Sequence, residues 1–162
     1  MLAERTIDFD DRQAVVFDGT ATNYRELLRL VEDWSRVLDQ YGIRAGDVVA
    51  LDARYSPTAC AALLALAGRK AIIVPLDAPP RTKLAEFFDV AKVEFAITIE
   101  ADGARRVLRR ATGADHPLYQ QLRVDGRAGL VLFSADQGVR QGDEPAVGGP
   151  DRHRVLDQRH PG

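Results

Sequence analysis

The sequence predicts an α/β fold built on a mainly parallel sheet with helices on both faces. Strand-like and helix-like segments alternate along the chain from Gln13 to Ser134. Two of the strand segments, Asp47–Ala53 and Ala71–Leu76, are apolar over most of their length rather than at every second residue. Apolar strands separated by helices are typical of parallel sheets whose two faces are both covered.

The first expected elements are a strand at Gln13–Phe17 and a long helix over residues 22–42. Apolar residues recur in this helix at steps of three and four, which produces one apolar stripe. Asn23 and Glu26 have the spacing of a capping box, and Gly42 marks the end of the helix.

A second helix is predicted over residues 56–68. Ser56 is suited to the N-cap, Pro57 to the first helical position and Gly68 to the end. Apolar residues lie on all sides of this helix, so we expect it to be sandwiched between other elements.

The rest of the ordered region continues the alternation. The expected elements are the strand Ala71–Leu76, a helix over 82–93, the strand Glu94–Ile99, a basic amphipathic helix over 104–111, a short helix over 116–123 and a last strand over 128–134. Ligands in such sheets bind beyond the carboxyl ends of the strands, so Ser134, which ends the last strand, is a candidate site residue.

Composition favours one soluble domain. The chain has 162 residues, 46% hydrophobic and 28% charged, with a net charge of −2, which gives no general electrostatic reason to bind nucleic acid or an anionic membrane. The single cysteine, Cys60, excludes an intramolecular disulfide and suits a reducing compartment. No apolar run reaches the roughly 20 residues that span a bilayer, so we expect a cytoplasmic protein.

Residues 1–134 and 135–162 differ in composition, and we expect two regions with this boundary. The second region is rich in glycine, proline and charged residues and contains no aromatic residue. Its few apolar side chains cannot offset the entropy cost of ordering the chain. The sequence therefore predicts a partial α/β domain over 1–134 and a disordered tail over 135–162.

Several segments, in order, resemble the amino-terminal region of the adenylate-forming superfamily, the AMP-forming acyl-CoA synthetases and their relatives. These are ATNYRELLRLVEDWSRVLDQYGIRAGDVVAL, YSPTACAALLALAGRKAIIVPLDAPP and AGLVLFS. The chain departs from the family pattern at Lys70, where the family usually has glycine, and at Tyr55, where asparagine is common. The strand that ends at Ser134 looks more like that of an acyl- or aryl-CoA synthetase than that of a peptide synthetase.

The resemblance implies a reaction in which ATP activates a carboxylic acid to an acyl-adenylate, which then usually forms a thioester with coenzyme A (CoA). ATP, Mg²⁺ and CoA are therefore the cofactors expected for the intact family. None is expected to bind tightly to this chain alone, because relatives are several times longer. The acid substrate cannot be predicted from this region.

The family's phosphate-binding loop, approximately Ser-Ser-Gly-Ser/Thr-Thr-Gly-x-Pro-Lys-Gly, has no counterpart after Ser134. The chain instead contains acidic Asp136, Asp143 and Glu144 there, and no lysine follows Lys92. Carboxylates repel a polyphosphate, whereas the family loop wraps it with backbone N–H groups and a lysine. Ser134 is therefore either a remnant of the nucleotide site or a serine that satisfies a turn.

A shifted reading frame is one hypothesis for this departure. Codons compatible with Ser134–Gly138 include a set that, read one frame away, encodes Ser-Gly-Ser-Arg, which is close to the family loop. On this hypothesis the tail is out-of-frame translation that ends at an early stop.

No catalytic or metal-binding residue is predicted. Cys60 lies in an alanine-rich segment and is interpreted as a packing residue, and the three histidines have no metal-ligand spacing. The basic run Arg105–Arg110 is interpreted as a solvated helix face rather than a phosphate site. Asp52, near a strand end, lacks the acidic pair and lysine that a phosphoacceptor requires.

Three functions stay open at this stage. The first is a truncated ligase that is inactive alone, and the second is a non-catalytic subunit that associates with a separately encoded remainder of a ligase. The third is a small α/β binding module that shares only the pattern.

Overall fold

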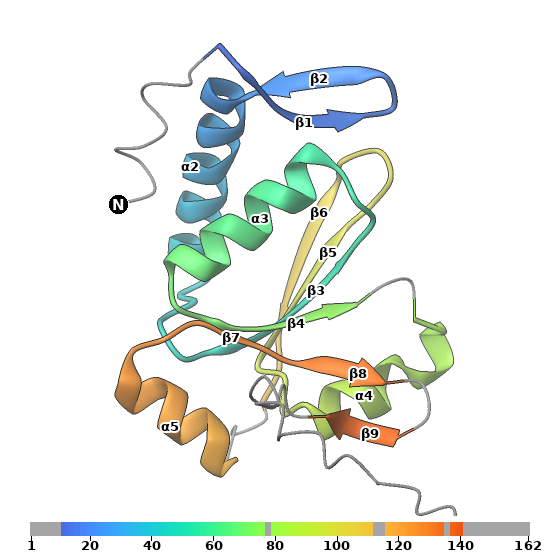
Figure 1. Cartoon of the computed structure of the whole chain (residues 1–162). Coiled ribbons are helices and arrows are strands. Elements are labelled where there is room, and N and C mark those ends of the chain that lie inside the picture. Colours follow the sequence, from blue (N-terminus) through green and yellow to red (C-terminus); the bar gives the residue numbers. More distant parts are fainter. Residues whose placement is uncertain (1–10, 77–78, 112–115, 135–136, 141–162) are drawn as a thin grey trace, which may run out of the picture.

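The computed structural model describes residues 11–76, 79–111, 116–134 and 137–140. Its main sheet has five strands in the order β6-β5-β3-β4-β7 (Figure 1). β3 pairs in parallel with both β4 and β5, and β4 pairs in parallel with β7, whereas β6 runs antiparallel to β5. The sheet strands are β3 (Val48–Ala53), β4 (Ile72–Leu76), β5 (Phe95–Ile99), β6 (Arg105–Arg109) and β7 (Gly129–Leu130).

Helices cover both faces of this sheet, which confirms the predicted fold class (Figure 1). One face carries α2 and α3, and the other carries α4 and α5. The helices are α2 (Tyr24–Gln40), α3 (Pro57–Gly68), α4 (Leu84–Val90), which follows a 3₁₀ turn η2 (Arg81–Lys83), and α5 (Pro117–Asp125).

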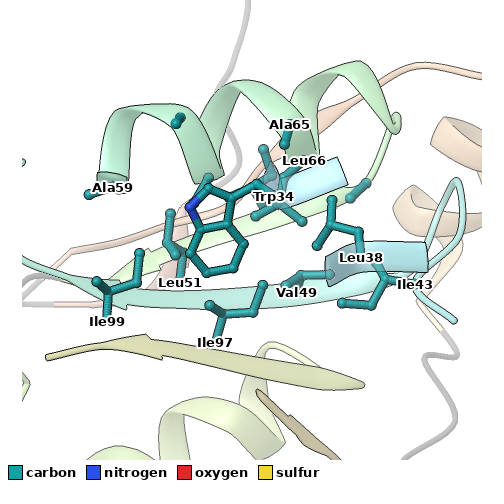
Figure 2. Packing of buried hydrophobic residues seen from close by; sticks show 14 of the residues in the cluster. Trp34, Leu38, Ile43, Val49, Leu51, Ala59, Ala65, Leu66, Ile97 and Ile99 are labelled. Atoms are coloured by element: carbon teal, nitrogen blue, oxygen red, sulfur yellow. The ribbon is translucent and has the colours of Figure 1, made fainter. Parts of the chain in front are cut away.

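The larger part of the core lies between the sheet and the pair α2 and α3. Trp34 of α2 is 1% exposed and packs among Leu51, Leu66 and Ile97 (Figure 2). Burying a large aromatic side chain removes 150–250 Å² from water, or roughly 4–6 kcal/mol at 25 cal/mol per Å². The single tryptophan is therefore a main contact between α2 and the sheet.

Local capping signals in the sequence are confirmed. Asn23 accepts a hydrogen bond from the Glu26 amide at 2.8 Å, and the Glu26 carboxylate accepts one from the Asn23 amide at 3.0 Å. Ser56 caps α3 by accepting from the Ala59 amide at 3.1 Å, with Pro57 at the first helical position.

The first predicted strand lies outside the main sheet. β1 (Gln13–Phe17) pairs antiparallel with β2 (Thr20–Asn23), a strand that was not predicted. The two strands form a separate hairpin that packs beside α2 and α3. A chain reversal at Asp18 and Gly19, both with positive φ, brings the two strands together.

The predicted helix over 104–111 is wrong, because Arg105–Arg109 forms strand β6. A tight turn joins it to β5: the Gly103 amide donates to the Glu100 carbonyl, and the Glu100 amide donates to the Ala104 carbonyl. The run has only two apolar residues, Val107 and Leu108, which are adjacent and define no clear period, and the strand resulted because β5 offers an unpaired edge.

The prediction that α3 is sandwiched is also wrong in part. One side of α3 packs on α2 and the sheet, but Leu63 and Leu64 are 39% and 38% exposed. The many alanines of α3 permit close packing on one side without requiring cover on the other.

The last predicted strand is divided. β7 pairs with β4, and Val131 continues this contact by donating from its amide to the Ile73 carbonyl at 2.8 Å. β8 (Leu132–Ser134) then pairs antiparallel with β9 (Gln137–Arg140). The predicted boundary at residue 134 lies within this hairpin, so Gln137–Arg140 form a strand where we expected a disordered tail. Residues 135–136 and 141–162 of that tail lie outside the described residues.

Candidate functional site

The sheet has a crevice beyond the carboxyl ends of β3 and β5. β3 continues through α3 toward β4, whereas β5 turns back into β6 on the opposite side. Connections that leave two neighbouring strands in opposite directions open a hollow between them, which is where open α/β sheets bind ligands. The hollow measures about 650 Å³ and is lined by Phe17, Arg54, Tyr55, Ser56, Pro57, Thr58, Ile99, Glu100, Ala101, Asp102 and Gly103.

Two aromatic rings, from Phe17 at the end of β1 and Tyr55 just before α3, line one wall of the crevice. The rings of Phe17 and Tyr55 have centroids 6.1 Å apart and are tilted by 60°. Pro57 has no amide hydrogen, and the Ser56 hydroxyl oxygen already accepts from the Ala59 amide. This helix start therefore offers a ligand fewer free N–H donors than an uncapped helix would.

The opposite wall contains carboxylates. Asp102 accepts a hydrogen bond from the Ala104 amide at 2.9 Å, within the turn between β5 and β6. Glu100 lies in the same turn and, with Arg54, gives the crevice mixed charge.

Asp52, at the end of β3, lies next to this crevice in the sheet. Burial raises the pKa of its carboxyl, the Arg81 guanidinium lowers it and the Glu100 carboxylate raises it, with a net upward shift. Asp52 aligns with Thr98 of β5 and Leu76 of β4. The carboxylates of Asp52 and Glu100 lie near each other at this edge of the sheet. Their negative charge weakens the attraction of the edge for a phosphate chain.

Ser134, the nucleotide-site residue considered from the sequence, is on a different part of the sheet edge. Its strand follows β7, which pairs with β4, while the crevice lies beyond β3 and β5. The backbone of Ser134 pairs with Gln137 in the β8–β9 hairpin. The chain therefore folds back where the family's phosphate loop would begin, and the residues present do not fit a loop that wraps ATP phosphates.

Cys60, singled out from the sequence, is not activated as a nucleophile. Burial raises the pKa of the Cys60 thiol, and a backbone hydrogen bond lowers it to a lesser extent, so the thiol is held protonated within α3. Among the described residues, no group of three or more His, Cys, Asp and Glu side chains is arranged to hold a metal ion. No helix in the described ranges has the length and hydropathy of a membrane span.

The crevice residues were missed because no sequence motif marks them. Tyr55 and Glu100 follow apolar strands, which is a weak signal for the ligand edge of a sheet. The two strands become neighbours only through the strand order, which local patterns do not report.

Comparison with known proteins identifies the family. The model of the AMP-binding enzyme family matches residues 2–156. The chain belongs to the AMP-binding enzymes. A curated family relative, nonribosomal peptide synthetase 30 of Fusarium vanettenii, is 34% identical over 122 residues, which are 74% of this chain and 2% of that protein.

Solved structures with the same fold include an adenylation domain and a coenzyme A synthetase. The artificially fused adenylation and carrier di-domain NpsA-ThdA from Klebsiella oxytoca superposes with a TM-score of 0.61 at 24% identity, over 82% of this chain and 27% of its own. The N-terminal subdomain of Klebsiella oxytoca NpsA gives 0.59 at 25% identity, over 81% and 36% of the two chains. The O-succinylbenzoate coenzyme A synthetase of Bacillus subtilis gives 0.56 at 17% identity, over 62% and 22%.

These matches agree with the family resemblance found in the sequence. The chain spans about a third of the solved subdomain and a small part of the peptide synthetase.

Proposed function

We propose that this chain forms the amino-terminal α/β part of an enzyme that activates a carboxylic acid with ATP, and that it does not complete the reaction alone. Membership of the AMP-binding enzymes and the shared fold support the proposal. The reaction yields an acyl-adenylate and pyrophosphate and requires Mg²⁺. On this proposal the residues that hold the adenosine and the acid belong to parts of the enzyme beyond the region described here.

The observation that carries the proposed inactivity is the chain that follows β8. It pairs back on β8 through Gln137–Arg140, and its sequence includes the acidic Asp136, Asp143 and Glu144. The strand pairing leaves no open loop to wrap a triphosphate, and the acidic side chains repel its negative charge. We therefore propose no step on ATP for residues of this chain.

The acceptor of the activated acid is proposed to be the thiol of a carrier domain rather than that of CoA. The sequence alone favoured an acyl-CoA synthetase, but the curated relative is a peptide synthetase, and one structural relative is a peptide-synthetase adenylation domain that was artificially fused to a carrier domain. The coenzyme A synthetase among the structural relatives has lower identity, 17%.

A second candidate function is a non-catalytic subunit that is completed by another polypeptide. The observation that favours it is the edge strand β7, which pairs only with β4 among the described residues. Only two residues of β7 pair with β4, and Leu130 and Leu132 are 57% and 54% exposed. An exposed, apolar sheet edge is suited to pairing with a further strand.

ATP–pyrophosphate exchange with a panel of carboxylic acids tests both candidates. We expect no exchange by the 162-residue chain alone and exchange when the remaining part of an adenylation domain is supplied as a second polypeptide. In the completed enzyme, Ser134→Ala tests whether this serine contacts the nucleotide, with Ser35→Ala on α2 as the matched control. Robust exchange by the isolated chain would show that the proposed inactivity is wrong.

The acceptor is tested separately by thioester formation. With a completed enzyme, labelled acid is expected to load onto a carrier domain and not onto CoA. Preferential formation of acyl-CoA would contradict the carrier-domain proposal and leave the adenylation proposal intact.

A further inference from the structure

Strand β6 is an open edge of the main sheet. Among the described residues it pairs only with β5 (Figure 1). The Glu100 amide bonds to the Ala104 carbonyl, and the Arg110 amide bonds to the Glu94 carbonyl, so even-numbered residues face β5 in the hydrogen-bond ladder. By the alternation of an antiparallel ladder, the backbone N–H and C=O groups of Arg105, Val107 and Arg109 point outward.

Arginine side chains flank this edge on both faces of the sheet. The Arg105 guanidinium lies 5.0 Å from the Trp34 ring centroid, and that of Arg109 lies 5.7 Å from the Phe95 ring centroid. Arg106 alternates to the opposite face and is exposed. Contact with the rings restrains two of the guanidinium groups beside the edge, which lowers the entropy cost of pairing them with carboxylates.

Arg110 is already engaged within the chain, although its Nε has no hydrogen-bond partner among the described residues. Its guanidinium pairs with the Asp89 carboxylate at 2.6 Å and lies 5.0 Å from the Phe88 ring centroid. Arg105, Arg106 and Arg109 are therefore the cations that this edge offers to a partner.

The charge pattern selects the kind of strand that can pair here. A second copy of the chain, added antiparallel about Val107, would place the Arg105 position opposite another Arg109. Like charges directly opposite each other destabilise a sheet, whereas opposite charges stabilise it by about 0.2–1 kcal/mol per pair. The edge therefore disfavours self-pairing and favours a strand whose carboxylates face these three arginines.

We propose that β6 is the docking edge for an extended acidic segment of a partner, which adds to the sheet as a sixth strand. Its central residues are apolar, because they lie opposite Val107 and Leu108. Read antiparallel from the position opposite Arg109 to that opposite Arg105, the matching pattern is acidic, apolar, apolar, acidic, acidic. The peptide core EVVEE has this pattern.

The test is nuclear magnetic resonance of the full chain with a peptide that contains EVVEE. Binding is expected to slow hydrogen exchange of the outward amides of Arg105, Val107 and Arg109. The inward amides of Arg106 and Leu108 already pair with β5, so their exchange is expected to change little. Uniform shifts over the whole basic surface, without this alternation, would overturn strand addition.

Two altered peptides separate strand pairing from charge. EVPEE keeps the charge but removes the amide opposite Val107, so its affinity is expected to fall roughly tenfold. KVVKK keeps the strand propensity and reverses the charge, and it is expected not to bind. Two results would show a general polyanion site and overturn the proposal. The first is equal affinity for EVVEE and EVPEE. The second is that heparin displaces EVVEE and itself slows the exchange of the same amides as the peptide does.

Charge reversal in the protein completes the test. The triple variant Arg105→Glu, Arg106→Glu, Arg109→Glu is expected to bind KVVKK and no longer to bind EVVEE. The control Arg29→Glu, Arg36→Glu, Arg127→Glu has the same net charge and is expected to bind EVVEE as the unaltered chain does. Because Arg105 and Arg109 cover buried rings, Arg106→Glu alone is a second variant, with affinity for EVVEE expected to fall roughly threefold.

Two further outcomes would overturn the proposal. Absence of EVVEE binding at millimolar peptide would mean that the arginines only protect the edge from aggregation. If the unaltered chain self-associates and the triple variant does not, the edge pairs with a second copy of the chain instead of an acidic partner.

Discussion

The Nε of Arg123 on α5 donates a hydrogen bond to the carbonyl oxygen of Gly46, 77 residues earlier in the chain, at a distance of 2.9 Å. The same guanidinium lies 3.5 Å from the Glu94 carboxylate, which accepts from the Val48 amide at 2.8 Å. One side chain therefore connects α5 to the amino-terminal ends of β3 and β5. A Cβ at Gly46 would lie 2.5 Å from the Arg123 Cγ, so this approach requires glycine.

Gly46→Ala is expected to reduce the free energy of unfolding by about 2 to 4 kcal/mol, through backbone strain at φ +81° and the contact with Arg123. Urea denaturation measures the change. Gly42→Ala is the matched control, because it has φ +70° but nothing within 4 Å of the added methyl group. Its loss is expected to be only about 1 to 2 kcal/mol, and equal losses in both variants would contradict the role of Arg123.

Lys70→Gly is expected to stabilise the protein by about 1 kcal/mol, because Lys70 has φ +60° at the turn between α3 and β4. Glycine is the residue usual here in the family that the sequence resembles. The control Arg69→Gly lies at φ −73°, where glycine relieves no strain, and it is expected to destabilise because it also removes the bonds of Arg69 to Asp39 and to the Ser35 carbonyl. Thermal unfolding of the two variants distinguishes the effects, and destabilisation by Lys70→Gly would contradict the strain argument.

Trp34→Ala is expected to destabilise the protein by about 3–5 kcal/mol, because it leaves a large cavity between α2 and the sheet. The Trp34 indole N–H is buried and has no hydrogen-bond partner among the described residues. Trp34→Phe removes this donor and is therefore expected to cost only about 1–2 kcal/mol. Circular dichroism with urea measures both, and a similar loss in the two variants would contradict the importance of ring packing.

Asp52 is expected to lower stability as the pH rises. Its folded pKa is raised, mainly by burial, so the folded state binds the proton more tightly than the unfolded state does. The free energy of unfolding therefore decreases from the ordinary carboxyl pKa near 3.8 up to the folded value. Relative to the unaltered chain, Asp52→Asn is expected to gain stability at pH 7 but not at pH 3.

The neighbours of Asp52 supply a control for this prediction. Arg81 lowers the pKa of Asp52, so Arg81→Gln is expected to raise it further, whereas Glu100→Gln is expected to lower it. Carboxyl ¹³C titration of Asp52 follows both shifts. Movement of the two variants in the same direction would contradict the assignment of causes.

The predictions from sequence succeeded where a signal is local. Asn23 and Glu26 specify a helix start because both partners lie within one turn, and Ser56 with Pro57 does the same for α3. The apolar stripe predicted that one face of α2 is buried, and Trp34 lies on that face. The helix predicted at Arg105–Arg109 is wrong, because two adjacent apolar residues define no period and pairing with β5 decided the structure.

The amino acids by themselves determined the α/β class, the capped helices and the family resemblance, because each depends on residues close together in the chain. Tertiary structure decided the strand order, and with it the crevice between β3 and β5 and the open edge at β6. Strand order depends on which apolar faces and unpaired backbone groups meet after helices have crossed the sheet. Those encounters join residues far apart in the chain, and no local pattern encodes them.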